Sequence, residues 1–580
     1  MPFNIVNRSR IGMQEVKAGS RPPWVGLAAA VWVQVAAGAA YTFPLYSPSL
    51  KAVLGLGQQQ LALLGVANDV GENFGLVAGL VSARFRTWVV LLAGAACCFV
   101  GFGVLWLALS RTIIGLPFWL LWIALCIGTN SSAWLITGVL VTNMRNFPVS
   151  RGTVSGILKG YVGLSGSIFT GLYASVLGSS PNNLILFLSI GLPAICLAMM
   201  SLVRPCTPST VENSTESCHF VVIQVLSIIL GLYLLVFTFL NSYYSLNDVG
   251  AGAFFGGIVL LLLAPLAIPI KMTIFKPKRE HASVTVSMVP SIDDLEDDTA
   301  TKPLLDAADL LNLQEFSDDV SYADMLLAVG EGAVKEKKRP RRGDDFEVHE
   351  AFVKADFWLL FLAFFIGAGT GVTVLNNLAQ IGSAAGVDDP TILLCLFSFG
   401  NFLGRLGGGA VSEHFVRTRM LPRPFWMMCT QITMVIAYLF YAWGLRLTLN
   451  VSTALLGVCY GAQTAVMIPT TSELFGLNNF GTFFNFMLLG NPLGATLFSS
   501  LLAGYLYDQE AARQHSVFLH EDSSSCHGPH CFRLTFFILA AVCSLGTLLC
   551  IILTERIRPV YQMLYASGSF RHPKASSSLH

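Results

Sequence analysis

The chain has 580 residues, of which 54% are hydrophobic and only 12% are charged. Soluble domains average about 25% charged residues, so this composition excludes an ordinary soluble protein. The formal net charge of +1 points to no class of partner, because in a membrane protein the placement of charges matters more than their sum. We expect an all-α, polytopic membrane protein that lies in a lipid bilayer and has no nucleic-acid partner.

The first stretch of the chain, residues 1–23, is polar and carries several basic side chains ahead of the first apolar run. This start does not fit a cleavable signal peptide. We therefore expect the first apolar run to be an uncleaved anchor, with the N-terminus in the cytosol. The basic residues are Arg8, Arg10, Lys17 and Arg21.

About fourteen apolar runs have the length of a membrane helix, which needs roughly 20 residues. Basic residues such as Arg84, Arg204 and Arg423 gather in the turns that this count places in the cytosol, as the positive-inside rule expects. Both termini should therefore be cytosolic. The expected spans are 24–46, 61–82, 87–109, 117–142, 153–177, 184–203, 219–241, 251–270, 356–381, 390–411, 424–445, 451–472, 482–507 and 533–554.

The first six spans recur in the last six. Thr142 and Gly152 fall on Thr471 and Gly481 at one constant offset, and matching spans enter the membrane from the same side. Such parallel repeats are expected when the axis relating them runs along the membrane normal. The predicted division is a cytosolic N-terminus (1–23), a six-helix half (24–210), two inserted helices (211–270), a charged linker (271–354), a second six-helix half (355–555) and a cytosolic tail (556–580).

The linker carries an acidic cluster at 293–298 and a basic cluster at 335–342. Blocks of like charge with few aromatic residues indicate a disordered or regulatory segment. The basic cluster could contact anionic lipid headgroups, or it could only enforce topology as part of a solvated linker. Residues 306–311 have the acidic-dileucine spacing of sorting signals, a pattern that also arises by chance. A plasma membrane or a vacuolar or endosomal membrane is the expected location.

Four polar residues lie near the middle of the span 61–82: Asn68, Asp69, Glu72 and Asn73. Their spacing of three and four residues lets them share one sector of a helix. An ionisable group inside a bilayer costs roughly 2.5 kcal/mol or more and often marks a pathway. Asp69 or Glu72 is therefore predicted to carry a coupling proton. The alternative is a helix contact in which these polar groups only hold neighbouring helices together.

Residues Gly404 to Phe415 resemble the signature of the major facilitator superfamily between the second and third helices of a half. Gly404, Gly408 and Glu413 would be its glycines and its acid. The first half departs from the pattern, because Ala83 stands where the acid is expected. Three stretches are also similar to the plant nodulin-like major facilitator proteins, including the nuclear-fusion-defective type: Trp24 to Pro48, Asn146 to Gly152 and Arg341 to Trp358. The resemblance implies the fold and a membrane location but no particular solute.

Within this frame, Arg405 resembles the arginine with which monocarboxylate- and oxalate-type facilitators hold a substrate carboxylate. An arginine stays charged and offers a bidentate fork. It could instead pair with the acid of its own signature loop. Lys159 could bind an anionic group, or it could extend to the headgroups. The other predicted substrate-binding residues are Tyr41, Asn130, Asn376, Asn377, Gln380 and Asn401.

Before the last span, Cys526 and Cys531 flank a short loop that also contains His527 and His530. The spacing matches no standard zinc finger, so we expect no metal site. A short disulfide on the oxidising face is one interpretation, and a free loop is the other.

The sequence predicts a secondary transporter in which two halves rock about a central site. Its cargo would be a small polar or anionic organic solute, moved together with protons by a monomer without a cofactor. No nucleotide-binding loop or hydrolase motif is present, so we do not expect an enzyme. The alternative is a membrane sensor or scaffold that signals through residues 271–354.

Overall fold

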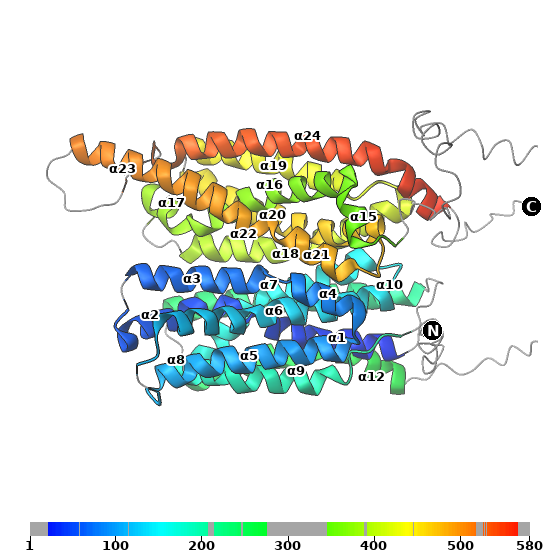
Figure 1. Cartoon of the computed structure of the whole chain (residues 1–580), viewed down its shortest axis with the longest axis horizontal. Coiled ribbons are helices and arrows are strands. Elements are labelled where there is room, and N and C mark those ends of the chain that lie inside the picture. Colours follow the sequence, from blue (N-terminus) through cyan, green and yellow to red (C-terminus); the bar gives the residue numbers. More distant parts are fainter. Residues whose placement is uncertain are drawn as a thin grey trace, which may run out of the picture. The chain divides into compact units, whose positions relative to one another are not determined.

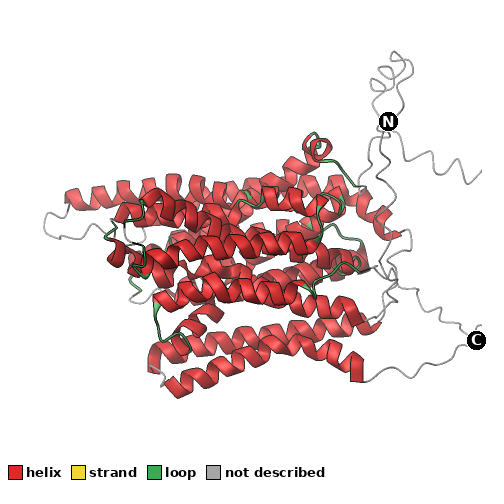
Figure 2. Ribbon diagram, turned by 60° about the horizontal axis from the view of Figure 1, so that its bottom comes forward, coloured by secondary structure: helices red, strands yellow, loops and turns green. Residues whose placement is uncertain are grey.

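The computed structural model describes residues 21–56, 58–113, 115–206, 214–244, 248–274, 345–387, 391–444, 446–517, 526, 528 and 530–566. In these ranges all regular structure is helical (Figures 1 and 2). The N-terminal residues 1–20, the charge clusters at 293–298 and 335–342, and the dileucine pattern at 306–311 lie outside the described residues.

The first half is built from long helices, several of them interrupted. Its elements are α1 (Arg21–Ala36), η1 (Ala37–Thr42), α2 (Phe43–Leu54), α3 (Gln58–Asn73), α4 (Leu76–Arg84), α5 (Thr87–Leu109), α6 (Phe118–Asn146), α7 (Arg151–Ser175), α8 (Pro181–Leu186), η2 (Phe187–Gly191) and α9 (Leu192–Met200). Two inserted passages follow, formed by α10 (Ser214–Tyr244), α11 (Asp248–Leu263), η3 (Ala264–Leu266) and α12 (Ala267–Ile274).

The second half begins with the short helix α15 (Val348–Phe352). Its other elements are α16 (Ala355–Asn376), α17 (Leu378–Ala384), α18 (Thr391–Arg419), α19 (Pro424–Trp443), α20 (Arg446–Phe475), α21 (Phe480–Leu488), α22 (Gly490–Gly494), η4 (Ala495–Gly504), α23 (Tyr505–Val517) and α24 (His530–Ala566).

Among the described residues, 12 helices are long and apolar enough to cross a membrane. The second and fifth predicted spans are not among them, although both are helical. The second is split into α3 and α4 at Phe74 and Gly75, and it carries Asp69 and Glu72. The fifth is α7, which contains Lys159 and many glycine and serine residues. These two passages are the most polar of the predicted spans. The protein is an integral, multi-pass membrane protein.

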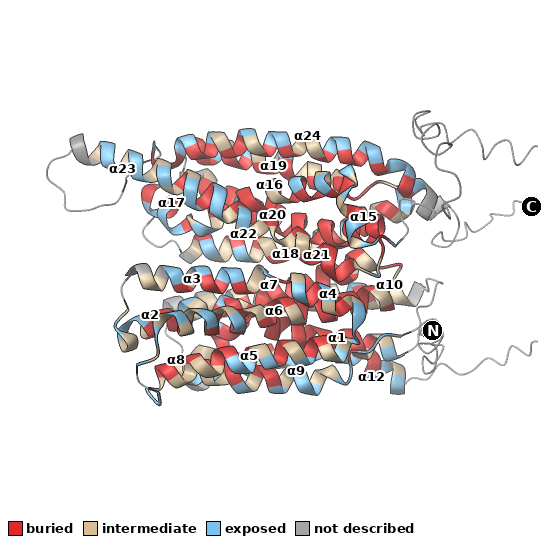
Figure 3. Cartoon of the chain, viewed as in Figure 1, coloured by how far each residue is buried: buried red, intermediate tan, exposed pale blue. Residues whose placement is uncertain are grey.

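The two halves meet where α7 packs against α18 and α4 packs against α21. At the first contact the main chains touch, because a Cβ atom added at Gly409 would clash with the carbonyl oxygen of Gly152. Close approach of helix backbones through small residues is common in membrane bundles. We call this contact zone the seam. Buried positions concentrate around α6, α20 and α21 (Figure 3).

The last helix runs further than the sequence predicts. We expected the final span to end at 554 and a cytosolic tail to begin at 556, but α24 continues to Ala566. Two contacts hold the extra turns: Arg556 pairs with Asp356 at 2.8 Å, and the buried Tyr561 donates to Glu473 Oε2 at 2.7 Å. The helix therefore continues about three turns beyond the predicted end of the last span.

Two glycines on α18 give a direct test of this packing. A Cβ atom at Gly404 would clash with the carbonyl oxygen of Val458 on α20, whereas a Cβ atom at Gly407 would meet nothing within 4 Å. Gly404→Ala should therefore lower the free energy of unfolding by about 1–3 kcal/mol through overpacking. Gly407→Ala should leave it unchanged or raise it by up to about 1 kcal/mol. Thermal unfolding of the purified variants measures both effects, and equal midpoints would contradict the prediction.

Candidate functional site

Five side chains from both halves come together at the seam: Tyr41, Glu72, Lys159, Arg405 and Tyr460. The charge of Glu72 interacts with those of Lys159 and Arg405. The hydroxyl group of Tyr41 interacts with Glu72 and with Arg405, and Tyr460 interacts with the same two groups. We call these residues the central cluster. Three elements of the first half (η1, α3 and α7) and two of the second half (α18 and α20) contribute to it.

Tyr41 reaches the cluster because the first helix changes its winding. The α-helix gives way to the 3₁₀ segment η1 near Gly38, whose φ and ψ are −83° and 17°. Thr42 stabilises this segment by donating from Oγ1 to the carbonyl oxygen of Ala39 at 2.6 Å. A short 3₁₀ stretch inside a longer helix often marks a functional position. Tyr41 keeps 41% of its surface exposed.

Arg405 spans the seam. Its Nε donates to Asn401 Oδ1 at 3.1 Å, one helical turn earlier, and its Nη1 donates to the carbonyl oxygen of Lys159 at 2.9 Å. Only 6% of the residue is exposed. The guanidinium also makes a side-chain hydrogen bond with Tyr41. Arg405 does not pair with Glu413, which is bonded elsewhere. The alternative role that the sequence left open for Arg405 is therefore wrong.

Lys159 is also 6% exposed, and it does not extend to the end of its helix. Its ammonium group lies over the ring of Phe484 on α21, 5.1 Å from the ring centroid. A cation that faces an aromatic ring in this way is stabilised without an acid. Lys159 therefore faces the second half across the seam, next to Arg405.

The two acids of α3 differ in their surroundings. Glu72 is half-buried and belongs to the central cluster, whereas Asp69 is exposed. Asn68 donates to Asp69 Oδ1 at 3.4 Å, and Asn73 donates to the Asp69 carbonyl oxygen at 3.0 Å. Asp69 acts on Glu72 through its charge alone. The sequence does not distinguish the two acids, whereas in the structure only Glu72 belongs to the central cluster.

Asn130 lies at the break between α3 and α4. Its amide nitrogen donates to the carbonyl oxygens of Gly71 and Phe74 at 2.9 and 2.7 Å, and its oxygen accepts from Trp134. Interrupted helices leave carbonyl groups without helical partners, and those groups must find other donors inside a membrane. Asn130 therefore holds α3 and α4 in place beside the cluster, and its own polar atoms are engaged.

The polar residues of α16 and α17 lie at a second helix break. Asn377 donates to the Thr373 carbonyl oxygen at 2.8 Å and to Ser499 Oγ at 2.9 Å. Asn376 and Gln380 are exposed. Asn401 is the predicted amide that contacts the central cluster, because it accepts a hydrogen bond from Arg405 and so orients it.

A second set of charges lies nearer one end of the bundle and is tightly bonded. Arg423 is fully buried, and it donates to Glu413 Oε2 at 2.8 Å and to Glu473 Oε1 at 2.7 Å. Arg417 donates to Glu413 Oε1 at 3.1 Å. We call Glu413, Arg417, Arg423 and Glu473 the end network. Two arginines balance two glutamates, which limits the cost of burying them.

The end network also binds the first half. The backbone N–H of Gly152 donates to Glu413 Oε2 at 2.7 Å. Arg417 Nη2 donates to the carbonyl oxygen of Val149 at 2.6 Å and to Ser150 Oγ at 3.0 Å. These bonds cross the seam, whereas the bonds from Arg423 to Glu413 and Glu473 join helices of the second half.

Sequence reasoning missed Tyr460, Arg423 and Glu473 as parts of these sites. Arg423 stands among other basic residues in a turn, so it was read only as a topogenic charge. Tyr460 and Glu473 lie on α20, more than three helical turns apart, and no motif marks them. The signature glycines serve packing, because Gly404 and Gly408 lie against Val458 and Ala462 of α20.

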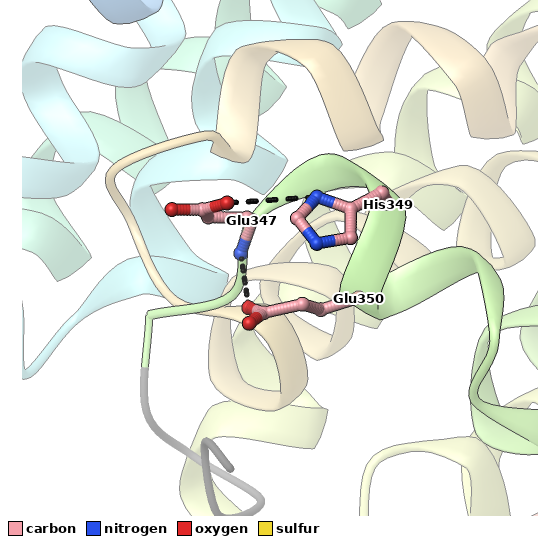
Figure 4. Close-up of side chains that lie close together, drawn as sticks. All are labelled: Glu347, His349 and Glu350. Carbon is pink, nitrogen blue, oxygen red and sulfur yellow. Dashed lines mark hydrogen bonds and ion pairs between the residues drawn. The ribbon is translucent and has the colours of Figure 1, made fainter. Parts of the chain in front are cut away.

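Two smaller features concern possible metal binding. Cys526 and Cys531 form a disulfide, so their sulfur atoms are not metal ligands. Glu347, His349 and Glu350 lie close together (Figure 4). Glu350 accepts from the backbone N–H of Glu347 at 2.9 Å, and the two residues form the capping box of α15. This helix start accounts for the grouping, in which the side chains of Glu347 and His349 are 60% and 73% exposed.

Residues 23–270 match the Nodulin-like family model, and residues 344–563 match the model of the NFD4 C-terminal domain. The chain therefore carries a Nodulin-like domain followed by an NFD4 C-terminal domain. The nodulin-like protein is 29% identical over 555 residues to Protein NUCLEAR FUSION DEFECTIVE 4 of Arabidopsis thaliana, which covers 93% of this chain and 90% of that protein. The family resemblance read from the sequence is confirmed.

Among solved structures, a double-tryptophan mutant of XylE is similar to the nodulin-like protein, with a TM-score of 0.52 and 12% identity over 93% of this chain and 98% of that chain. The E. coli fucose:proton symporter FucP matches with a TM-score of 0.43 and 12% identity, over 90% of this chain and 98% of that chain. XylE is a major facilitator protein. The predicted major facilitator fold is confirmed, and it is a fold of transporters.

Arg423 offers a test of the end network. Arg423→Ala should lower the free energy of unfolding by about 3–5 kcal/mol, because two buried carboxylates would lose the cation they share. Thermal unfolding in detergent is the measurement. Arg419→Ala is the matched control, since Arg419 is exposed and only covers the ring of Phe415 at 5.7 Å. A variant of Arg423 that is as stable as the control would disprove the role assigned to the network.

Proposed function

We propose that this nodulin-like protein is a secondary active transporter that moves a small polar or anionic organic solute together with protons. The two halves would rock about the seam and expose the central cluster to each side of the membrane in turn. We further propose a monomer in a plasma, vacuolar or endosomal membrane, with both termini in the cytosol.

The observation that carries this proposal is the composition of the central cluster. Arg405 of the second half donates to the Lys159 carbonyl oxygen of the first half at 2.9 Å, and Glu72 interacts with the charges of both residues. A site shared by two halves changes when the halves move. Solute sites of transporters with repeated halves lie at such an interface.

The charges of the cluster favour an anionic group on the solute. Lys159 and Arg405 are two buried cations, and Glu72 is the single acid among the five residues. No salt bridge joins Glu72 to either cation among the described ion pairs, so the acid does not occupy them fully. No carboxylate pairs with Arg405 among the described ion pairs, and a guanidinium binds a carboxylate through two N–H groups.

Proton coupling follows from competition for the same cations. When Glu72 takes up a proton, its attraction to Lys159 and Arg405 ends, and a solute carboxylate can bind them instead. One proton and one negative charge would then cross together without net charge. Asp69, which is exposed and acts on Glu72 through its charge, would be the outer proton acceptor.

The end network supports the other requirement of alternating access, which is closure at one end. Three hydrogen bonds of this network cross the seam, from Gly152 to Glu413 and from Arg417 to Val149 and Ser150. Opening this end would break these bonds, while the bonds between Arg423 and Glu473 would persist within the second half.

Arg405→Lys tests the binding role. The variant keeps the charge but loses the planar fork, so the affinity for a carboxylate should fall about tenfold or more. The measurement is a thermal-shift screen with a panel of small carboxylic acids, amino acids and sugars, because a ligand of the folded state raises its stability. Arg419→Lys on the same helix is the control and should keep the wild-type shifts. An acid that stabilises the Arg405 variant as strongly as the wild type would refute the role.

Glu72→Gln tests proton coupling. Uptake of the solute found in the screen should lose its response to a pH gradient in proteoliposomes, because the amide cannot exchange a proton. Solute exchange without a gradient should continue, and Asp69→Asn should show a weaker form of the same defect. Glu510→Gln, on the partly exposed helix α23, controls for the loss of a carboxylate. An undiminished response to the gradient in both acid variants would exclude this coupling mechanism.

A further inference from the structure

The linker that joins the two halves re-enters the described bundle at Asp345 and Phe346. There it contacts the turn between α20 and α21, residues 476–479. The central cluster and the end network involve neither Asp345 nor this turn. The contact therefore needs its own explanation.

Asp345 binds the N–H groups of the turn. Its Oδ1 accepts from the backbone N–H of Leu477 at 2.8 Å and of Asn478 at 3.1 Å, and its Oδ2 accepts from the Asn478 side chain at 2.8 Å. A carboxylate that accepts several N–H bonds holds a backbone segment firmly. The neighbouring Phe346 is buried, donates its backbone N–H to the carbonyl oxygen of Phe475 at 3.2 Å and packs against the Phe475 ring.

The turn is shaped to receive the linker. Gly476 has a φ of +79°, a conformation that favours glycine. A Cβ atom at this position would also clash with the Asp345 carboxylate. Asn479 completes the contact by donating to the Phe346 carbonyl oxygen at 2.9 Å.

The opposite side of the same turn binds the first half. Arg145, in the last turn of α6, donates from Nη2 to the carbonyl oxygens of Leu477 at 2.9 Å and of Asn478 at 3.4 Å. The charges of Arg145 and Asp345 also interact. Leu477 and Asn478 are thus each held at two points, by a linker carboxylate on their backbone N–H groups and by a first-half guanidinium on their carbonyl oxygens.

We propose that Asp345 is a positioning residue through which the linker controls the opening of this end of the transporter. By fixing Leu477 and Asn478, it presents their carbonyl oxygens to Arg145 and so strengthens the closed seam. Loss of the Asp345 contact would release Arg145 and loosen the bonds that Gly152 and Arg417 make across the seam. This inference rests on the proposed alternating access, but its test needs no transport.

The test is hydrogen exchange of the full-length protein in nanodiscs, comparing wild type with Asp345→Ala. Two reporters are followed: the amides of Leu477 and Asn478, which bond Asp345, and the amide of Gly152, which bonds Glu413 across the seam. We expect exchange about tenfold faster at the turn. Because opening of the seam is shared, we also expect exchange about threefold faster at Gly152.

Arg145→Ala should give the same increase at Gly152, and the double variant should add little to it, because both residues act through one turn. Asp345→Asn, which keeps an acceptor oxygen, should give a smaller increase and serves if the alanine variant does not fold. Glu350→Gln is the matched control, because its carboxylate belongs to the same segment but bonds only the start of α15.

Faster exchange at the turn with a wild-type rate at Gly152 would show that Asp345 is only a local structural residue, and would overturn the inference. Unchanged exchange at the turn would overturn it as well. Because these readouts are independent of solute and proton movement, a failure of the transport proposal gives a different result: the exchange pattern stands while the Glu72 and Arg405 variants behave as wild type.

Discussion

The guanidinium of Arg423, shared by the carboxylates of Glu413 and Glu473, determines how the second half is assembled and where it can meet the first. Arg423 begins α19, Glu413 lies on α18 and Glu473 on α20, and Tyr561 of α24 adds a bond to Glu473. Four helices are therefore joined at one buried point. A buried ion group of this kind is stable only when every charge has a partner. Glu413 can accept one more hydrogen bond, and the backbone N–H of Gly152 donates it across the seam.

The two charged groups of the protein are thus built in opposite ways. The end network is fully bonded, with contacts of 2.7–3.1 Å between its charges. The central cluster holds its acid and its cations by longer-range attraction, with Lys159 over an aromatic ring and no ion pair between Glu72 and either cation among the described residues. A fully bonded group resists change. A group with unmet bonding capacity can accept a ligand. In our proposal the end network therefore closes one end of the protein, and the central cluster binds the solute.

The sequence predicted the ionisable residues of this arrangement, because burying such side chains in a bilayer is energetically costly. Glu72, Lys159 and Arg405 were each conspicuous inside an apolar run, and they do lie together. The sequence could not show that Asp69 is exposed while Glu72 is not. Helical spacing tells which residues share one side of a helix, but it does not tell what packs against that side. It could not reveal Tyr460, because one tyrosine in an apolar helix is ordinary. Asn130 looked like a binding residue because its partners, the carbonyls of a broken helix, exist only in the fold.

The interruption of α3–α4 and the low hydropathy of α7 have a consequence for any experimental map of this membrane protein. A topology drawn from hydropathy alone would pass over both passages. Omitting the first inverts the assigned direction of α5 and α6, and omitting the second restores it from α8 onward. The two mistakes cancel, so the total stays even and both chain ends fall on the expected side. A reporter in the turns at residues 85–86, 110–117 or 147–150 lies where the two topologies disagree.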